Sequence, residues 1–272
     1  MKELRVSSWR ELNASMLYPE SGSKWSEELQ RFASPFVFRG LPNAAFDLSP
    51  SLLRFRGSLT RGEKIPIEMQ LLRLFQKYSH NIAAHETSTW NWLALAQHHG
   101  LPTRLLDWTV SPYVALHFLT AQSQFDASDG AIWRVDIFEA NKYLPELLMN
   151  ILIEEGTSTF TAAMLDRTVT SLEQFQGLSK TDFLVFFEPP SLDARIVNQY
   201  AIFSMMPNPL SKLDEWLNTH PEIATKIIVP RELKVEVREK LDQLNITERM
   251  LFPGLDGLSA WLKRHCGHGG LV

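Results

Sequence analysis

Apolar residues recur along the chain with two spacings, one typical of helices and one typical of strands. Helical spacing predicts helices at residues 67–78, 90–98, 113–121 and 233–244, and a helical lead-in over residues 1–24. Short β-rich runs bounded by glycine or proline predict strands at residues 36–40, 130–138, 182–187, 195–205 and 226–229. This mixture predicts an α+β protein.

The sequence contains no internal repeat and no low-complexity linker, so we expect one domain. Its predicted bounds are residues 25–264, and a flexible tail is expected over residues 265–272. The chain has 272 residues, which suffice for a substantial hydrophobic core.

Charge and cysteine content narrow the possible partners and compartments. The net charge of −4 gives no overall positive field for nucleic acid or an anionic membrane. The single cysteine, Cys266, excludes an internal disulfide and fits a reducing compartment. No apolar run reaches the roughly 18 residues that span a bilayer, and the first residues lack the apolar core of a signal peptide. We therefore expect a cytoplasmic protein without a membrane partner.

The densest cluster of polar functional groups runs from Gln97 to Thr109. It lies between two predicted apolar helices, where Gly100 is placed to stop a helix and Pro102 cannot continue one. Loops held by rigid elements are where functional sites concentrate. Two interpretations stay open: a functional site, or an ion pair between Arg104 and Asp107 that ties the loop down.

Two further polar residues stand at or in predicted strands. Arg39 ends an apolar strand and precedes Gly40, and its planar guanidinium suits a carboxylate or a phosphate. The alternative is a structural salt bridge, with Asp107 as one candidate partner. Gln199 is predicted inside an apolar strand, where a buried amide needs partners, so it either fixes a loop or faces a cleft.

Several kinds of site are disfavoured. His98 and His99 are adjacent and do not face the same way on a helix, so we expect no metal site there. His265, Cys266 and His268 supply three ligands, whereas a structural zinc site needs four. The sequence has neither a glycine-rich phosphate loop nor a Gly-x-Ser-x-Gly hydrolase motif.

Three segments together resemble the FRG-domain family, which is named for its Phe-Arg-Gly signature. They are Phe38-Arg39-Gly40, Gln97–Thr109 and Arg195–Gln199. The resemblance extends over roughly residues 25–262. The chain departs from the family at Ala201, where glycine is frequent, and at Ser111, where asparagine is usual.

The order of these segments is also similar to that of ADP-ribosyltransferase folds, which implies a split, mostly antiparallel sheet flanked by helices. It implies that NAD is the substrate, that its ADP-ribose is transferred or hydrolysed, and that the setting is a toxin or antiphage defence. Carried over by position, Arg39 contacts NAD phosphate or ribose, Thr103 lies near the nicotinamide ribose, and Gln199 occupies the place of a catalytic glutamate. The remaining predicted NAD contacts are His98, His99 and Arg104.

A glutamine cannot neutralise the positive charge that grows at the ribose, so a carboxylate is expected from Asp107 or Glu188. We expect Arg39, His99, Arg104, Asp107 and Gln199 to meet in one cleft. The acceptor is expected to be a protein or nucleic acid. Two alternatives stay open: a non-enzymatic module that binds a nucleotide, another small molecule or nucleic acid, and a protein-interaction scaffold.

Overall fold

A computed structural model describes residues 2–17, 24–26, 31–55, 61–79, 86–191 and 193–267. Its strands are β1 (Lys2–Arg5), β2 (Lys24–Ser26), β3 (Arg31–Ala33), β4 (Phe36–Leu41), β5 (Leu106–Thr109), β6 (Gly130–Asp136), β7 (Phe160–Thr161), β8 (Val185–Glu188), β9 (Ala201–Met205) and β10 (Ala224–Val229). Its α-helices are α1 (Trp9–Leu17), α2 (Ser51–Arg54), α3 (Arg61–Tyr78), α4 (Thr89–His98), α5 (Pro112–Thr120), α6 (Ile137–Asn141), α7 (Glu146–Glu155), α8 (Ala162–Asp166), α9 (Leu172–Gly177), α10 (Ala194–Asn198), α11 (Leu213–Asn218), α12 (Lys234–Gln243), α13 (Glu248–Leu251) and α14 (Leu255–Gly267).

Within these described residues, eight strands form one sheet in the order β1-β10-β6-β4-β5-β9-β8-β7, and β2 pairs with β3 separately. The pairs β1–β10 and β7–β8 are parallel and the others are antiparallel. The predicted α+β class is therefore confirmed. The predicted split is not seen, because the sheet is continuous, and the likeness to an ADP-ribosyltransferase architecture is not confirmed.

The two central strands of the sheet, β4 and β5, share very few paired residues. β4 pairs with β6 along its whole length, from Phe36 to Leu41, but pairs with β5 only through Phe38 and Thr109. β5 in turn pairs with β9 along its whole length. The two halves of the sheet are thus joined by one residue pair, and β4 and β5 are not paired on either side of it.

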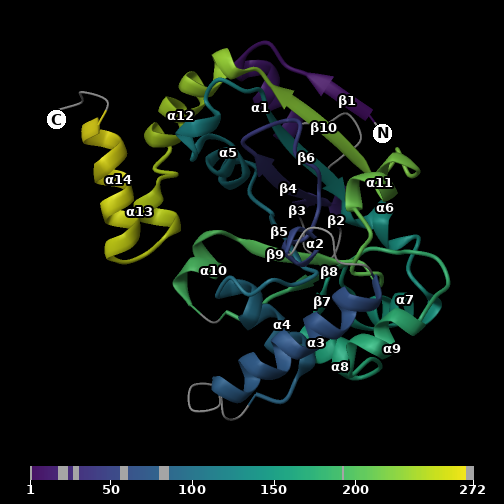
Figure 1. Cartoon of the computed structure of the whole chain (residues 1–272). Helices are drawn as coiled ribbons and strands as arrows, with labels where there is room; N and C mark the ends of the chain where they lie inside the picture. Colours follow the sequence, from purple (N-terminus) through teal and green to yellow (C-terminus); the bar gives the residue numbers. More distant parts are fainter. Residues whose placement is uncertain are drawn as a thin grey trace.

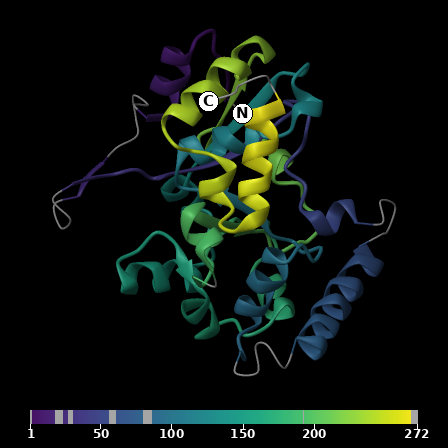
Figure 2. The ribbon, with the colours of Figure 1, turned by 90° about the vertical axis from the view of Figure 1, so that its left-hand side faces the viewer.

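Helices cover both faces of the β4 half (Figures 1 and 2). On one face α1, α5 and α12 pack on a core that includes Phe36 and Phe38. On the other face α6 and α11 cover a core that includes Val37 and Trp133. The α4, α7, α8 and α9 helices enclose a third core with β8 and β9. The C-terminal α13 and α14 lie outside the α5 and α12 layer (Figures 1 and 2).

The glycine of the Phe-Arg-Gly segment permits the contact between α5 and β4. A Cβ atom added at Gly40 would lie 1.8 Å from the carbonyl oxygen of Ala115, which belongs to the helix backbone. Residue 40 must therefore lack a side chain for α5 to approach this closely.

The helix before the central motif ends as predicted. The Ser88 hydroxyl caps the start of α4. At its end the N–H of Leu101 donates to the carbonyl of Ala96 at 2.9 Å, the N–H of Gly100 donates to that of Gln97 at 3.0 Å, and Gly100 has a φ of 81°. This is a Schellman motif, which needs a left-handed residue after the helix. The motif fixes where the last residues of α4 lie.

Some predicted elements are wrong. Residues 195–199 are not part of a strand, because the Asp193 carboxylate accepts from two backbone N–H groups and starts α10. Asp136 starts α6 in the same way, so β6 ends before residue 137. The lead-in begins with β1, and its helix covers only residues 9–17. Residues 265–267 of the predicted flexible tail belong to α14, and residues 268–272 lie outside the described residues.

Candidate functional site

A cleft of about 990 Å³ lies beside the single pair that joins β4 to β5. This volume is at the upper end of the roughly 300–1,000 Å³ typical of small-molecule sites. Residues of β4, α4, β5, α5, α10 and β9 line it, together with residues from the segment that follows β4. Five of the predicted site residues are among them: Arg39, His98, His99, Asp107 and Gln199.

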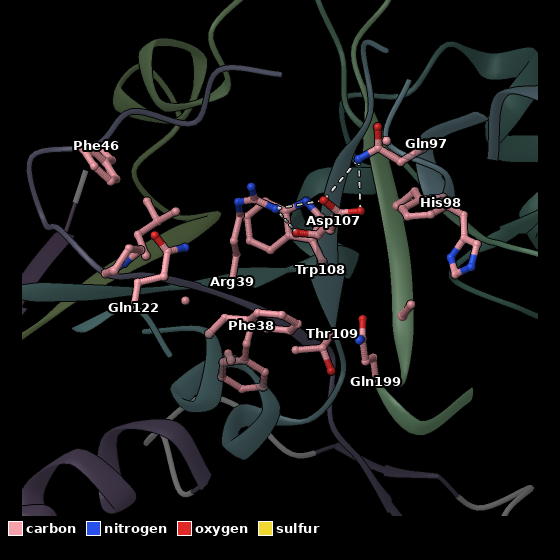
Figure 3. Close-up of a pocket in the computed structure, with 18 of the residues that line it drawn as sticks. Phe38, Arg39, Phe46, Gln97, His98, Asp107, Trp108, Thr109, Gln122 and Gln199 are labelled. Atoms are coloured by element: carbon pink, nitrogen blue, oxygen red, sulfur yellow. Dashed lines mark hydrogen bonds and ion pairs between the residues drawn. The ribbon is translucent and has the colours of Figure 1, made fainter. Parts of the chain in front are cut away.

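Arg39 and Asp107 face one another in this cleft (Figure 3). The Arg39 Nη1 donates to the Asp107 carbonyl oxygen and lies 3.7 Å from the carboxylate oxygen Oδ2. The Arg39 Nε is buried and has no hydrogen-bond partner among the described residues. Burial lowers the pKa of Arg39 and the charge of Asp107 opposes this, although an arginine stays protonated at any physiological pH. A buried donor without a partner is costly, so the Arg39 side chain is left one hydrogen bond short by the described residues.

The Asp107 carboxylate is held from a second side by Gln97. The Gln97 Nε2 lies 3.1 Å from both Asp107 carboxylate oxygens, and its amide oxygen accepts from the hydroxyl of Thr103 at 2.5 Å. The Thr103 hydroxyl accepts in turn from the N–H of Leu105. This chain of bonds fixes which way the amide points. Asp107 is nevertheless 58% exposed, so its charge is oriented and still reaches the cleft.

His98 makes the third polar contact in the cleft. Its Nε2 lies 2.6 Å from Oδ2 of Asp193, and its side chain is 10% exposed. The pKa of the Asp193 carboxyl is lowered: burial raises it, but the N–H of Ile196 and the His98 ring outweigh this effect by bonding the carboxylate. The neighbouring His99 ring lies edge-on to His98, with 5.1 Å between ring centroids.

Gln199 lies at the end of α10 and not inside a strand. Its Nε2 donates to the carbonyl of Leu251 at 3.0 Å, and the adjacent Asn198 donates to that of Met250 at 2.7 Å. These bonds tie α10 to α13. Gln199 therefore fixes a neighbouring segment and lines the cleft as well, which combines the two roles that its sequence context left open.

Three predicted site residues lie away from the cleft. Arg104 is 1% exposed and pairs with Glu68 of α3, not with Asp107, while its Nη1 donates to the carbonyl of Pro207. Thr103 is buried, with its hydroxyl already bonded. Glu188 accepts a hydrogen bond from Thr159 at 2.7 Å. None of the three lines the cleft, so the expected convergence holds for Arg39, His99, Asp107 and Gln199 but not for Arg104.

Sequence reasoning missed several lining residues. They are Phe46, Asp47, Arg54, Gln122 and Arg195. The segment after β4 carries no periodic pattern, and its arginines were the only signal that could have pointed to the cleft. Arg195 belongs to the third FRG-like segment, but the strand predicted there gave it no site role, and the structure places it on α10 at the cleft.

The described ranges contain neither a candidate metal site nor a candidate membrane span. No group of three or more His, Cys, Asp or Glu side chains is arranged there to hold a metal ion. No helix of those ranges has both the length and the apolar character needed to cross a membrane.

Residues 34–128 match the family described as FRG domain. The chain carries an FRG domain. The matched range includes β4, α4, β5 and α5, and hence both Arg39 and Asp107. The α10 wall lies beyond the match, so the resemblance of the chain from residue 129 to residue 262 stays a prediction. No curated protein and no solved structure matches the chain.

Proposed function

We propose that the FRG-domain cleft binds NAD as its substrate and that the protein breaks the bond between nicotinamide and ribose. ADP-ribose then passes to water or to another acceptor. The observation that carries this proposal is the oriented carboxylate of Asp107 beside the Arg39 guanidinium in one large cleft. A toxin or antiphage defence, where loss of NAD harms a cell, is the setting that we propose for it.

The binding part of the proposal rests on charge and shape. Arg39, Arg54 and Arg195 line the cleft, and guanidinium groups are well suited to the two phosphates of NAD. Phe46 and Phe118 add aromatic surface on which a base or nicotinamide ring can stack.

The chemical part rests on Asp107. Loss of nicotinamide leaves positive charge on the ribose ring, and a fixed negative charge nearby lowers the energy of that state. Asp107 has such a charge, is 58% exposed and is held in place by Gln97. Gln199 is neutral and its amide already bonds Leu251, and Glu188 lies outside the cleft. Asp47 also lines the cleft, but its carboxylate pairs with Lys212. Asp107 is therefore the carboxylate that we assign to this role.

Replacement of Asp107 by asparagine tests the assignment. Asp107→Asn keeps the volume and removes the charge, so nicotinamide release from NAD should fall about 100-fold or more while NAD affinity changes little. Glu188→Gln is the matched control, because it removes a carboxylate outside the cleft, and it should keep full activity. Wild-type protein that releases no nicotinamide, or an Asp107→Asn variant as active as wild type, would overturn the proposal.

A second candidate function is a non-enzymatic module that binds a nucleotide or nucleic acid. Its favouring observation is that Asp107 contacts Arg39 itself, an arrangement that also orients the guanidinium toward a phosphate. Binding of NAD, ADP-ribose or RNA by calorimetry, with no nicotinamide release under any condition, would select this function over the first.

A further inference from the structure

His98 lines the cleft and pairs with Asp193, which does not line it, and the proposed function does not use this pair. The two oxygens of Asp193 have different partners. Oδ1 accepts from the N–H groups of Arg195 and Ile196 at 2.9 and 3.1 Å, and Oδ2 lies 2.6 Å from the Nε2 of His98. The start of α10 thus fixes the carboxylate, and the carboxylate fixes the imidazole.

This geometry determines which nitrogen of His98 is basic. A carboxylate can only accept, so the Nε2 of His98 carries the proton of their hydrogen bond. In the neutral ring Nδ1 is then the nitrogen with a free lone pair, and it has no hydrogen-bond partner among the residues that the structure describes. A base whose second nitrogen is held by a carboxylate is the arrangement that activates nucleophiles.

The charges of the cleft limit which acceptor this base can serve. Three arginines line the cleft against two aspartates, Asp47 and Asp107, and this excess of positive charge disfavours a cationic acceptor such as an arginine side chain. A carboxylate acceptor needs no base, because it carries no proton to remove. Water and hydroxyl groups are uncharged and become strong nucleophiles when they lose a proton.

We propose that His98 is the general base for an oxygen acceptor, either water or a hydroxyl group, and that Asp193 is its positioning residue. The inference rests on the proposed function. The bond between the ribose C1′ and the nicotinamide nitrogen breaks, and its electron pair leaves with neutral nicotinamide. The acceptor oxygen bonds C1′, and its proton moves to the Nδ1 of His98 and then to solvent. Asp193 stabilises the imidazolium in between.

The decisive variant is Asp193→Asn. Asparagine caps a helix as well as aspartate does, so α10 should keep its start. Its amide nitrogen would donate to the Nε2 of His98 and move the ring proton to Nδ1, where it blocks proton uptake. Turnover of NAD should fall about 100-fold or more, while NAD affinity and thermal stability stay close to wild type. Nitrogen NMR of the His98 side chain should show the change of tautomer directly.

The matched control is Asp136→Asn, which replaces the capping aspartate of α6 outside the cleft and should keep wild-type turnover. His98→Gln should lose as much turnover as Asp193→Asn. If the His98–Asp193 contact only joins α4 to α10, it survives in Asp193→Asn and turnover stays at the wild-type level. Wild-type turnover by that variant, or an unchanged His98 tautomer, therefore overturns this inference but not the proposed function. Absence of nicotinamide release by the wild type overturns it together with the proposed function.

Mass spectrometry separates the two acceptors: free ADP-ribose identifies water, and ADP-ribose attached to a hydroxyl-bearing side chain identifies the alternative.

Discussion

Two arginines that the sequence placed in the same ligand-binding set occupy opposite environments. Arg104 is buried, and its Nε, Nη1 and Nη2 all donate to Glu68 or to the carbonyl of Pro207. Arg39 has a side chain that is 19% exposed, a long contact with the Asp107 carboxylate and a buried Nε without a partner among the described residues. All three guanidinium nitrogens of Arg104 are hydrogen-bonded within the interior, whereas the Nε of Arg39 has no partner among the described residues.

This difference distinguishes residues that stabilise the folded protein from residues whose side chains can bind a ligand. A buried ion pair with all donors bonded is destabilised strongly when one partner is removed, because the other charge is left buried. A partly exposed pair contributes little to folding. The comparison therefore predicts large stability effects at Arg104, and binding effects with little loss of stability at Arg39.

The largest effect is expected for Arg104→Met. Removal of the guanidinium leaves the Glu68 carboxylate, which is 1% exposed, without its counter-charge. The free energy of unfolding should fall by about 3–5 kcal/mol, measured by urea denaturation. Arg167→Met is the control, because its pair with Glu155 is exposed, and it should cost about 0–1 kcal/mol. Equal losses in the two variants would show that the Arg104 pair is not part of the structural core.

A second interior group gives a prediction on pH. His117 is fully buried and its Nδ1 accepts from Arg238, and burial together with the Arg238 charge lowers the pKa of His117 from 6.5 to about 4. Between these two values the unfolded chain binds more protons than the folded protein. The free energy of unfolding should therefore decrease as the pH falls from about 7 to 4, by about 3 kcal/mol from this group.

The His117→Gln variant isolates that contribution. Glutamine keeps an acceptor for Arg238 and does not titrate, so the unfolding free energy of the variant should depend less on pH between 7 and 4 than that of wild type. Urea denaturation at several pH values measures both curves. Parallel curves would mean that His117 does not cause the pH dependence of the unfolding free energy.

Much of the fold could be predicted from local patterns. β4, α4, α5 and β10 lie close to their predicted ranges, because apolar periodicity and terminal signals such as Gly100 act over a few residues. The error at residues 195–199 has a local cause as well. Their apolar content resembles a strand, and the capping role of Asp193 outweighs it. The single joining pair of β4 and β5 could not be predicted, since strand order depends on packing between distant segments.

The site was predictable only in part. Residues of the Phe-Arg-Gly and Gln97–Thr109 segments line one cleft, as predicted, and spacing suggested a loop clamp between Arg104 and Asp107. The partner of Arg104 is instead Glu68, 36 residues earlier, and spacing within one motif carries no information on such a contact. Asp193 lies 95 residues from His98 and was absent from the predicted site for the same reason.

The smallest stability effect, and the sharpest contrast with Arg104, is expected for Arg39→Ala. Its carboxylate contact with Asp107 is 3.7 Å long and its Nη1 also donates to the Asp107 carbonyl, so the free energy of unfolding should fall by only about 1–2 kcal/mol. Binding of NAD or ADP-ribose, measured by calorimetry, should be abolished, because the guanidinium and its unpartnered Nε are lost from the cleft. Arg5→Ala removes an exposed arginine, which pairs with Asp129 outside the cleft, and should leave both quantities near wild type. A loss of 3 kcal/mol or more at Arg39 would place it with Arg104 as a residue of the fold, since only a pair on which folding depends costs that much to break.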